Sequence, residues 1–265
     1  VLRDALGRRC NPWLVGLVNY IIATASQLGR SPLSSPPALW QARSVALGAA
    51  TGVFYALNFL LFIPLLERKG VSITSAMLRL AVIFPILASL WLWGERLNLY
   101  QGLGLGLSLI ALPLLTVNPA EGWQGLDRRA TGLLLLLLVG NGASMVLAKA
   151  YQMGASPHQD APYLASLFGA AMLVSAAAWA GKRRGSSRRD LLPGAGLGLT
   201  NALANWGLVS ALGALPGVLV FPVYSALGLV FTALLARWIF GERVTRLELS
   251  GMAVAVAAVA LANLG

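Results

Sequence analysis

The chain has 265 residues, of which 57% are hydrophobic and only 11% are charged, and its mean hydropathy is +0.73. Soluble domains carry about 25% charged residues, so a chain this poor in charge cannot cover a water-facing surface. The net charge of +11 would suit a nucleic-acid-binding protein, but the basic residues form short clusters between apolar runs and no nucleic-acid-binding module is recognisable. One cysteine, Cys10, and one histidine, His158, exclude a disulfide framework and a Cys/His metal cage.

Apolar segments of membrane-spanning length follow one another along the chain. A spanning helix needs about 20 apolar residues because the hydrocarbon core is about 30 Å thick. Helix is favoured over strand because the segments lack alternation and must satisfy their backbone amides internally. Nine segments qualify, at roughly 12–28, 44–66, 71–93, 99–117, 131–151, 162–181, 192–214, 218–240 and 247–264. The sequence therefore predicts an all-α integral membrane protein with nine transmembrane helices.

Short connections hold most of the charges. They are predicted at Glu67–Gly70, Gly94–Arg96, Lys182–Asp190 and Gly241–Arg243. If the connections alternate between two sides of the membrane, fourteen Lys and Arg residues fall on the side of residues 1–11 and three fall on the other. Because cytoplasmic loops are enriched in Lys and Arg, the side of residues 1–11 is predicted to be cytoplasmic.

The chain repeats itself with a shift of 147 residues. The segment Trp91–Leu97, which reads WLWGERL, returns as Trp238–Val244, which reads WIFGERV. The same shift, without gaps, matches Asn58 with Asn205. Gly-Glu-Arg is interpreted as a tight turn at the membrane surface with its charges in water. Internal repeats of this kind indicate that one structural unit occurs twice.

The repeat also predicts how the chain is organised. The segment at 131–151 would have its partner before residue 4, so we expect ten helices in the full-length protein, of which nine are visible here. The first half then covers residues 1–117 and the second covers 131–265. An odd number of helices per half inverts one half relative to the other, and two inverted five-helix repeats are typical of secondary transporters.

These features resemble the EamA type of the drug/metabolite transporter superfamily. The resemblance rests on Gly94-Glu95-Arg96 and Gly241-Glu242-Arg243, each followed by a Gly-rich helix, and on the segment Gly140–Tyr151, which reads GNGASMVLAKAY. It implies uptake or export of small metabolites by alternating access, without ATP. Small multidrug relatives carry a buried Glu in their first helix, whereas the only acidic residue here within a predicted span is Glu248, the second residue of 247–264, and none lies deeper. Proton coupling through a carboxylate is therefore unsupported.

Polar residues at the centre of two predicted spans are the first candidates for substrate binding. Asn58 and Asn205 are matched by the repeat, Tyr55 lies one helical turn from Asn58, and Asn201 lies one turn from Asn205. Polar groups inside spans tend to face the bundle interior. We expect Asn58 and Asn205 to line one central cavity about a pseudo-twofold axis. The alternative is interhelical hydrogen bonding that only holds the bundle together, worth about 0.6 kcal/mol per contact.

A second group of candidates includes the charges within spans, which are all cationic apart from Glu248 at the start of its span. Arg79 is expected to bind a carboxylate or phosphate, or else to extend back to the cytoplasmic interface. Lys149 and Arg237 are expected to reach the interface in the same way. Further substrate-binding candidates are Asn141, Tyr224 and Ser225, the last two just beyond Pro222. Pro85 and Pro222 each free a helix carbonyl and permit a kink. The excess of cations predicts an anionic or zwitterionic substrate.

Several other functions are disfavoured. The glycines at 102–106 and 194–198 lack a preceding strand and a following P-loop lysine, so close helix packing is the better interpretation. His158 and Asp160 are expected in a solvated outer loop and are not expected to bind a metal. No cofactor and no enzymatic activity are expected for the protein. The expected partners are the lipid bilayer and a small-molecule substrate, with a homodimer as an option and no nucleic acid. The expected location is the cell membrane, as a multi-pass protein of a bacterial inner membrane. The alternative function is a non-transporting membrane subunit or lipid-handling helper.

Overall fold

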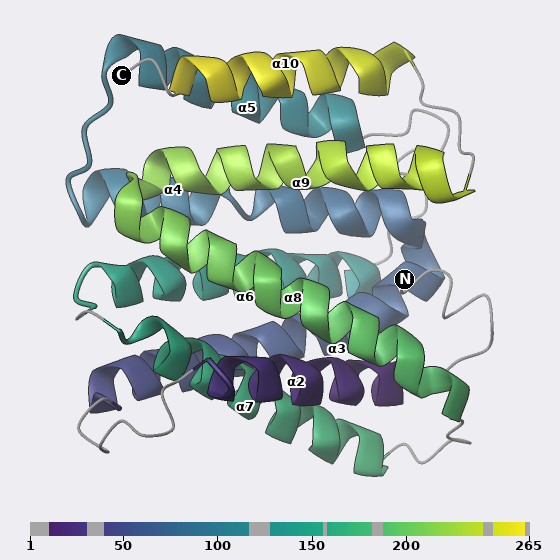
Figure 1. Cartoon of the computed structure of the whole chain (residues 1–265). Coiled ribbons are helices and arrows are strands. Elements are labelled where there is room, and N and C mark those ends of the chain that lie inside the picture. Colours follow the sequence, from purple (N-terminus) through teal and green to yellow (C-terminus); the bar gives the residue numbers. More distant parts are fainter. Residues whose placement is uncertain are drawn as a thin grey trace. The chain divides into compact units, whose positions relative to one another are not determined.

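The computed structural model describes residues 11–30, 40–116, 128–155, 158–181, 188–240 and 246–262 (Figure 1). Within these ranges all regular structure is helical, which confirms the all-α prediction. The helices are α2 (Pro12–Leu28), α3 (Ala42–Leu80), α4 (Ile83–Trp91), α5 (Leu99–Thr116), α6 (Arg128–Gln152), α7 (Asp160–Gly181), the 3-10 turn η3 (Arg188–Asp190), α8 (Leu191–Ala214), α9 (Gly217–Phe240) and α10 (Arg246–Ala262).

Three of the described helical segments are long and apolar enough to cross a membrane. They are Ala42–Leu65, Arg128–Gln152 and Asp160–Gly181. Shorter apolar helical segments lie at Met77–Trp91, Leu99–Ala111, Gly217–Gly228 and Leu249–Ala258. The number of helices that actually span the bilayer therefore stays a prediction.

The predicted turn at Glu67–Gly70 is wrong in the structure. Helix α3 continues through these residues as one helix of 39 residues with Pro64 inside it. Glu, Arg and Lys are all strong helix formers, so of the four residues only Gly70 opposes helix locally. The charges mark a polar segment of the helix and do not end it.

The predicted span at 71–93 is instead divided between α3 and α4. Ala81 and Val82 form a turn in which the Val82 N–H bonds the Arg79 carbonyl at 3.2 Å, three residues back. Pro85 follows four residues after Ala81 and has no N–H to give to the Ala81 carbonyl, which accepts the Phe84 N–H at 3.2 Å instead. The helix is therefore interrupted four residues before Pro85, where the sequence permits a kink. Pro222, by contrast, lies inside an uninterrupted α9.

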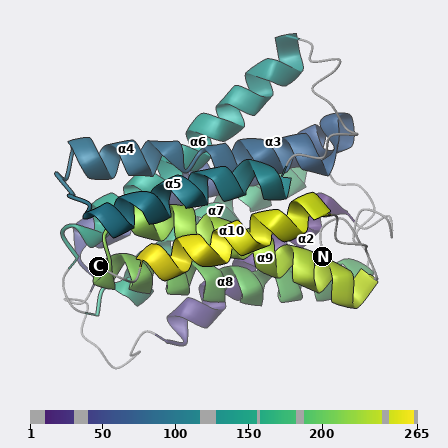
Figure 2. The same cartoon turned by 90° about the horizontal axis from the view of Figure 1, so that it is seen from above.

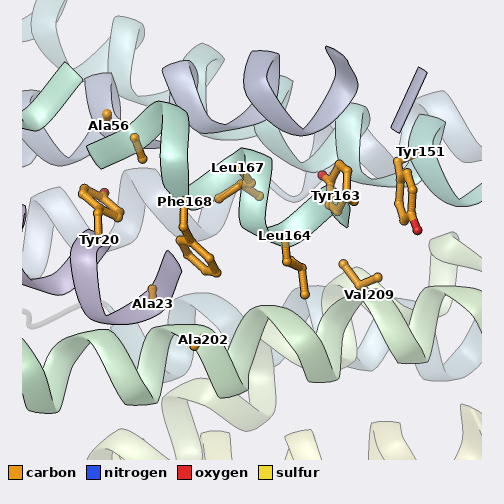
Figure 3. Close-up of a cluster of buried hydrophobic side chains, with 11 residues drawn as sticks. Tyr20, Ala23, Ala56, Tyr151, Tyr163, Leu164, Leu167, Phe168, Ala202 and Val209 are labelled. Carbon is orange, nitrogen blue, oxygen red and sulfur yellow. The ribbon is translucent and has the colours of Figure 1, made fainter. Parts of the chain in front are cut away.

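The chain divides into two compact units. Unit 1 contains residues Val1–Pro64 and Ala143–Gly213. Its described helices are α2, the first part of α3, the end of α6, α7 and α8. Helix α2 packs on α7, and the core between the helices combines tyrosines with aliphatic side chains (Figure 3). The rings of Tyr151 and Tyr163 stack in this core with centroids 3.9 Å apart.

Close approach of the helices in unit 1 depends on glycine. A Cβ at Gly194 would lie 2.7 Å from the Cβ of Val18, and one at Gly198 would collide with the carbonyl of Asn19. The predicted packing role is thus confirmed for Gly194 and Gly198, which lie four residues apart on α8 and face α2. Gly102 and Gly106 on α5 have no such neighbours within 4 Å.

Unit 2 contains residues Leu65–Gly142 and Ala214–Gly265. Helix α5 packs along α10, as both views show, and α9 packs on α4, α5 and α10 (Figures 1 and 2). Its core includes Ala111 of α5, Ala226 and Val230 of α9, and Met252 and Ala255 of α10.

Two features of unit 2 agree with the sequence repeat. Helix α5 begins at Leu99, and Arg246, which lies 147 residues later, is the first described residue of α10. The repeat-matched tryptophans behave alike as well, since Trp91 is 80% exposed and Trp238 is 90% exposed. Exposed tryptophans at helix ends suit the interface between lipid and water.

Candidate functional site

A hydrogen-bonded network of neutral polar side chains lies inside unit 1. The Tyr55 hydroxyl on α3 donates to Asn201 Oδ1 on α8 at 3.0 Å. Asn205 Nδ2, one turn further along α8, donates to the Tyr55 hydroxyl at 3.0 Å and to Asn201 Oδ1 at 2.9 Å. Three of the predicted site residues are therefore brought together, and each helps to fix the orientation of the other two.

The network extends to Asn19 of α2, which is not among the predicted site residues. Asn201 Nδ2 donates to Asn19 Oδ1 on α2 at 3.3 Å, and Asn19 is buried. Beside it, the Tyr20 hydroxyl donates to the Tyr55 carbonyl at 3.4 Å. Asn19 carried the same signal as Asn201, a polar side chain within an apolar run, but its segment is short and the repeat does not match it with another Asn.

Aromatic rings surround the network. Tyr20 meets the rings of Tyr55 and Phe59 edge-on with centroids 6.3 and 6.1 Å apart, and Phe168 of α7 meets Tyr55 at 6.4 Å. Figure 3 shows Phe168 and Tyr20 in the same cluster. Hydrogen bonds in such apolar surroundings are stronger than in water, and an unpaired polar group there is costly. The network therefore consists of uncharged donors and acceptors in apolar surroundings.

Asn58 is also buried in unit 1, but its amide is not part of this network. The side chain is 7% exposed, the same fraction as Asn205, and its Nδ2 has no hydrogen-bond partner among the residues that the structure describes. The prediction that Asn58 and Asn205 line one cavity stays a prediction, although both side chains are buried as it requires.

Arg79 forms the centre of a second polar group, which lies inside unit 2. It occupies the last turn of α3, where a cation interacts favourably with the helix dipole. Its Nη1 donates to the Ser225 carbonyl on α9 at 3.5 Å and lies close to Gly228. The Ser225 hydroxyl is buried and has no hydrogen-bond partner among the described residues. Arg79 is thus directed at α9, where its guanidinium makes a long hydrogen bond to a carbonyl.

Asn141 supports the break between α3 and α4. Its Nδ2 donates to the Leu78 carbonyl at 2.8 Å. In a continuous helix that carbonyl would accept the Val82 N–H, which here bonds Arg79 instead. The neighbouring Gly142 lies against Phe84. A Cβ at Gly142 would overlap with the Phe84 ring, so only glycine fits there. The structure therefore gives Asn141 a visible role in holding the broken helix.

Two other expectations need correction. Lys149 was expected to extend to the membrane interface, but its side chain is 3% exposed and packs within the protein. Asp160 was expected in a solvated loop, but it begins α7 and accepts the Tyr151 hydroxyl at 2.8 Å and Gln152 Nε2 at 3.4 Å. A carboxylate at a helix N-terminus is stabilised by the helix dipole. His158 is exposed, as predicted. The side chain of Arg237 lies outside the described residues.

Glu95 is not simply a solvated turn residue. Gly94, just before it, has a φ of +63°, which glycine adopts without strain. The Glu95 carboxylate accepts the backbone N–H of Gly217 at 3.0 Å and that of Val218 at 2.9 Å, at the start of α9. The turn after α4 therefore caps α9, and the repeat-matched Glu242 lies outside the described residues.

The comparisons with known proteins support a relationship over almost the whole chain. The EamA-like transporter family matches residues 1–117 and 130–264. A solved crystal structure of another protein superposes on the chain with a TM-score of 0.62 at 17% sequence identity, covering 97% of this chain and 99% of that one. At that identity the likeness concerns the fold alone. No curated protein matches the chain.

Proposed function

Because the chain belongs to the EamA-like transporter family, we propose that it is a secondary transporter that moves a small metabolite by alternating access. Members of this family are transporters of the drug/metabolite superfamily, and the apolar helices make the chain a multi-pass membrane protein. The proposed architecture has two inverted repeats, residues 1–117 and 131–265. Leu99 and Arg246, which the repeat matches, both lie in helices, α5 and α10, and this agreement supports it.

The observation that carries the transport proposal is the neutral polar network of unit 1. Tyr55, Asn201 and Asn205 lie within otherwise apolar helix packing and come from two different helices. Intramembrane polar groups are expensive, and in transporters they mark substrate pathways.

We further propose that the substrate carries an anionic group, as an anion or a zwitterion. Arg79 contacts a neutral carbonyl in unit 2. A guanidinium removed from water is stabilised best by a carboxylate or phosphate, which it binds through two parallel N–H bonds. The carbonyl that Arg79 contacts belongs to Ser225, and Tyr224 is the preceding residue. The side chains of Tyr224 and Ser225 are therefore expected to complete an anion site.

The test is transport by the full chain reconstituted into liposomes. Uptake of labelled carboxylates, phosphorylated sugars, zwitterionic amino acids and organic cations is measured for the wild type, Arg79→Gln and Arg79→Ala. Arg96→Gln, a change at an exposed arginine of the α4–α5 turn, is the control. We expect Arg79 variants to lose at least tenfold in kcat/KM for an anionic or zwitterionic substrate, while the control transports normally. Wild-type rates in both Arg79 variants, or an organic cation as the substrate, would contradict the anion proposal.

A liposome assay with no uptake of any class would favour the alternative function, a non-transporting membrane subunit or lipid-handling helper. The proposed location is the cell membrane, as in a bacterial inner membrane, and the proposed oligomer is a homodimer. Light scattering of the purified protein, with the mass of bound detergent subtracted, distinguishes a dimer from a monomer.

A further inference from the structure

Three polar residues form a stripe along one face of α3 in unit 1. Thr51, Tyr55 and Asn58 are spaced i, i+4 and i+7, which places them on the same side of the helix. The first two have partners from other helices. The Thr51 hydroxyl accepts the Tyr163 hydroxyl of α7 at 3.1 Å, and the Tyr55 hydroxyl bonds Asn201 and Asn205 of α8. Asn58 Nδ2, at the end of the stripe, has no partner within the described part of the chain.

Asn205 shows that an asparagine at this position of the repeat does not always have an amide without an acceptor. Asn205 is the repeat partner of Asn58 and is buried to the same 7% exposure. Its Nδ2 lies within hydrogen-bond distance of three acceptors, the Tyr55 hydroxyl, the Asn201 carbonyl and Asn201 Oδ1, at 2.9 to 3.0 Å. One amide of the duplicated pair is satisfied by the protein, whereas the other keeps a buried donor without an acceptor.

An unsatisfied buried donor destabilises a protein, whereas an apolar side chain of the same size at that position does not. The presence of a polar side chain at this position is explained if a bound ligand supplies the acceptor for its N–H. The polar side chains along the stripe and in the adjoining network are Thr, Tyr and Asn, and none of them is charged. A carboxylate placed among them would have no counter-charge, so an uncharged acceptor is favoured.

We propose that Asn58 is a substrate-binding residue whose Nδ2 donates to an uncharged carbonyl or hydroxyl oxygen, and that Asn205 is a positioning residue that holds Tyr55. This inference rests on the proposed transport function for the identity of the ligand as a substrate. It concerns residues of unit 1 alone and is separate from the anion site proposed in unit 2.

The first test is the thermal stability of the purified full chain without added ligand. Asn58→Leu removes a donor that has no partner, so its melting temperature is expected to equal or exceed that of the wild type. Asn205→Leu removes a donor with several partners, so its melting temperature is expected to fall by several degrees. Thr200→Val is the matched control, because Thr200 is exposed and its hydroxyl bonds only to its own helix. A fall in Asn58→Leu as large as that in Asn205→Leu would show a structural role and overturn the proposal.

The second test is binding of three small probes that differ only at their polar end. Propionamide offers a neutral carbonyl, propionate an anion and propylammonium a cation without an acceptor. Millimolar binding is within reach of ligands of this size. Calorimetric titration of the wild type is expected to detect propionamide and not propylammonium. The Kd for propionamide is expected to rise at least tenfold in Asn58→Leu and to be restored in part in Asn58→Ser, which keeps a hydroxyl donor.

Each outcome of the binding test decides the matter. No propionamide binding to the wild type, or equal binding to wild type and Asn58→Leu, overturns the proposal, and so does tighter binding of propylammonium. Binding does not require transport. If the protein binds propionamide through Asn58 but moves no solute in liposomes, the inference about Asn58 is supported and the proposed transport function is contradicted.

Discussion

The carboxylate of Glu95 accepts the backbone N–H of Val218 at 2.9 Å, which joins the turn after α4 to the first turn of α9. The same carboxylate accepts the N–H of Gly217 at 3.0 Å. The first N–H groups of a helix have no partner within the helix, and a negative charge there is favoured by the helix dipole. One side chain therefore satisfies two amides and places its charge where it is most stabilising.

Removing this cap is expected to destabilise the protein. Glu95→Ala leaves both amides without their acceptor, and losses of side-chain caps cost about 0.5–2 kcal/mol. Glu95→Gln keeps one acceptor oxygen but loses the charge, so an intermediate effect is expected. The measurement is the melting temperature in detergent. Arg96→Ala, at the exposed neighbouring position, is the control, and a fall as large as that of Glu95→Ala would indicate that the whole turn matters and the cap does not.

Asn141 is expected to matter for stability through the broken helix. Asn141→Leu removes the donor to the Leu78 carbonyl, and a hydrogen bond of this kind contributes about 1 kcal/mol. A lower melting temperature is therefore expected.

The control for Asn141 comes from the same helix. A Cβ at Gly132 would meet nothing within 4 Å, so Gly132→Ala should raise stability through helix propensity by up to about 1 kcal/mol. A melting temperature of Asn141→Leu at or above that of the wild type would show that the carbonyl finds another donor.

The hydrogen bond between Tyr55 and Asn205 can be measured by a double-mutant cycle. Tyr55→Phe and Asn205→Ala remove the two partners of one 3.0 Å bond. Residues in one network show coupling energies of about 0.5–3 kcal/mol. Unfolding in denaturing detergent of the two single variants and the double variant gives the coupling. Tyr55→Phe combined with Asn98→Ala, which shares no partner with it, should be additive, and additivity of the Tyr55–Asn205 pair would contradict the network.

The repeat predicts that the two Gly-Glu-Arg segments face opposite sides of the membrane. Gly94–Arg96 and the C-terminus are expected outside, and Gly241–Arg243, which lies outside the described residues, is expected in the cytoplasm. Arg96→Cys and Arg243→Cys, each in a Cys10→Ser background, are labelled with an impermeant maleimide in intact cells and in inverted vesicles. Labelling of both from one side rules out inverted halves. Labelling from opposite sides in the reverse order rules out only the orientation inferred from Lys and Arg.

Helix content was predictable from the sequence because apolar runs between polar turns determine it directly. The interruption of α3 was misplaced, because the charges at Glu67–Lys69 resemble a loop but belong to strong helix formers. The break near Ala81 follows from Pro85, a local signal whose effect depends on whether neighbours such as Asn141 satisfy the freed groups.

The candidate site was predictable only in part. The spacing of Asn201 and Asn205 gave two members of the network, and Tyr55 was found through its neighbour Asn58. The contact of Asn19 with Asn201 joins residues 182 positions apart, and the cap on α9 joins residues 123 positions apart. No local pattern determines such pairs, because they depend on how helices pack. The repeat matches Asn58 with Asn205, but it does not reveal that the amide of Asn205 has hydrogen-bond acceptors whereas the amide N–H of Asn58 has none among the described residues.

The separation between Tyr55 and its partners has a consequence for biosynthesis. Asn205 follows Tyr55 by 150 residues, so at about 5–20 residues per second the ribosome needs roughly 8–30 seconds to deliver it. During that interval α3 has left the ribosome while the phenol of Tyr55 and the amide of Asn58 still lack α8. The nascent chain must hold these groups in contact with water, lipid headgroups or the translocation machinery. Variants that slow synthesis between α3 and α8 would therefore prolong the stage at which this helix is most exposed to quality-control proteases.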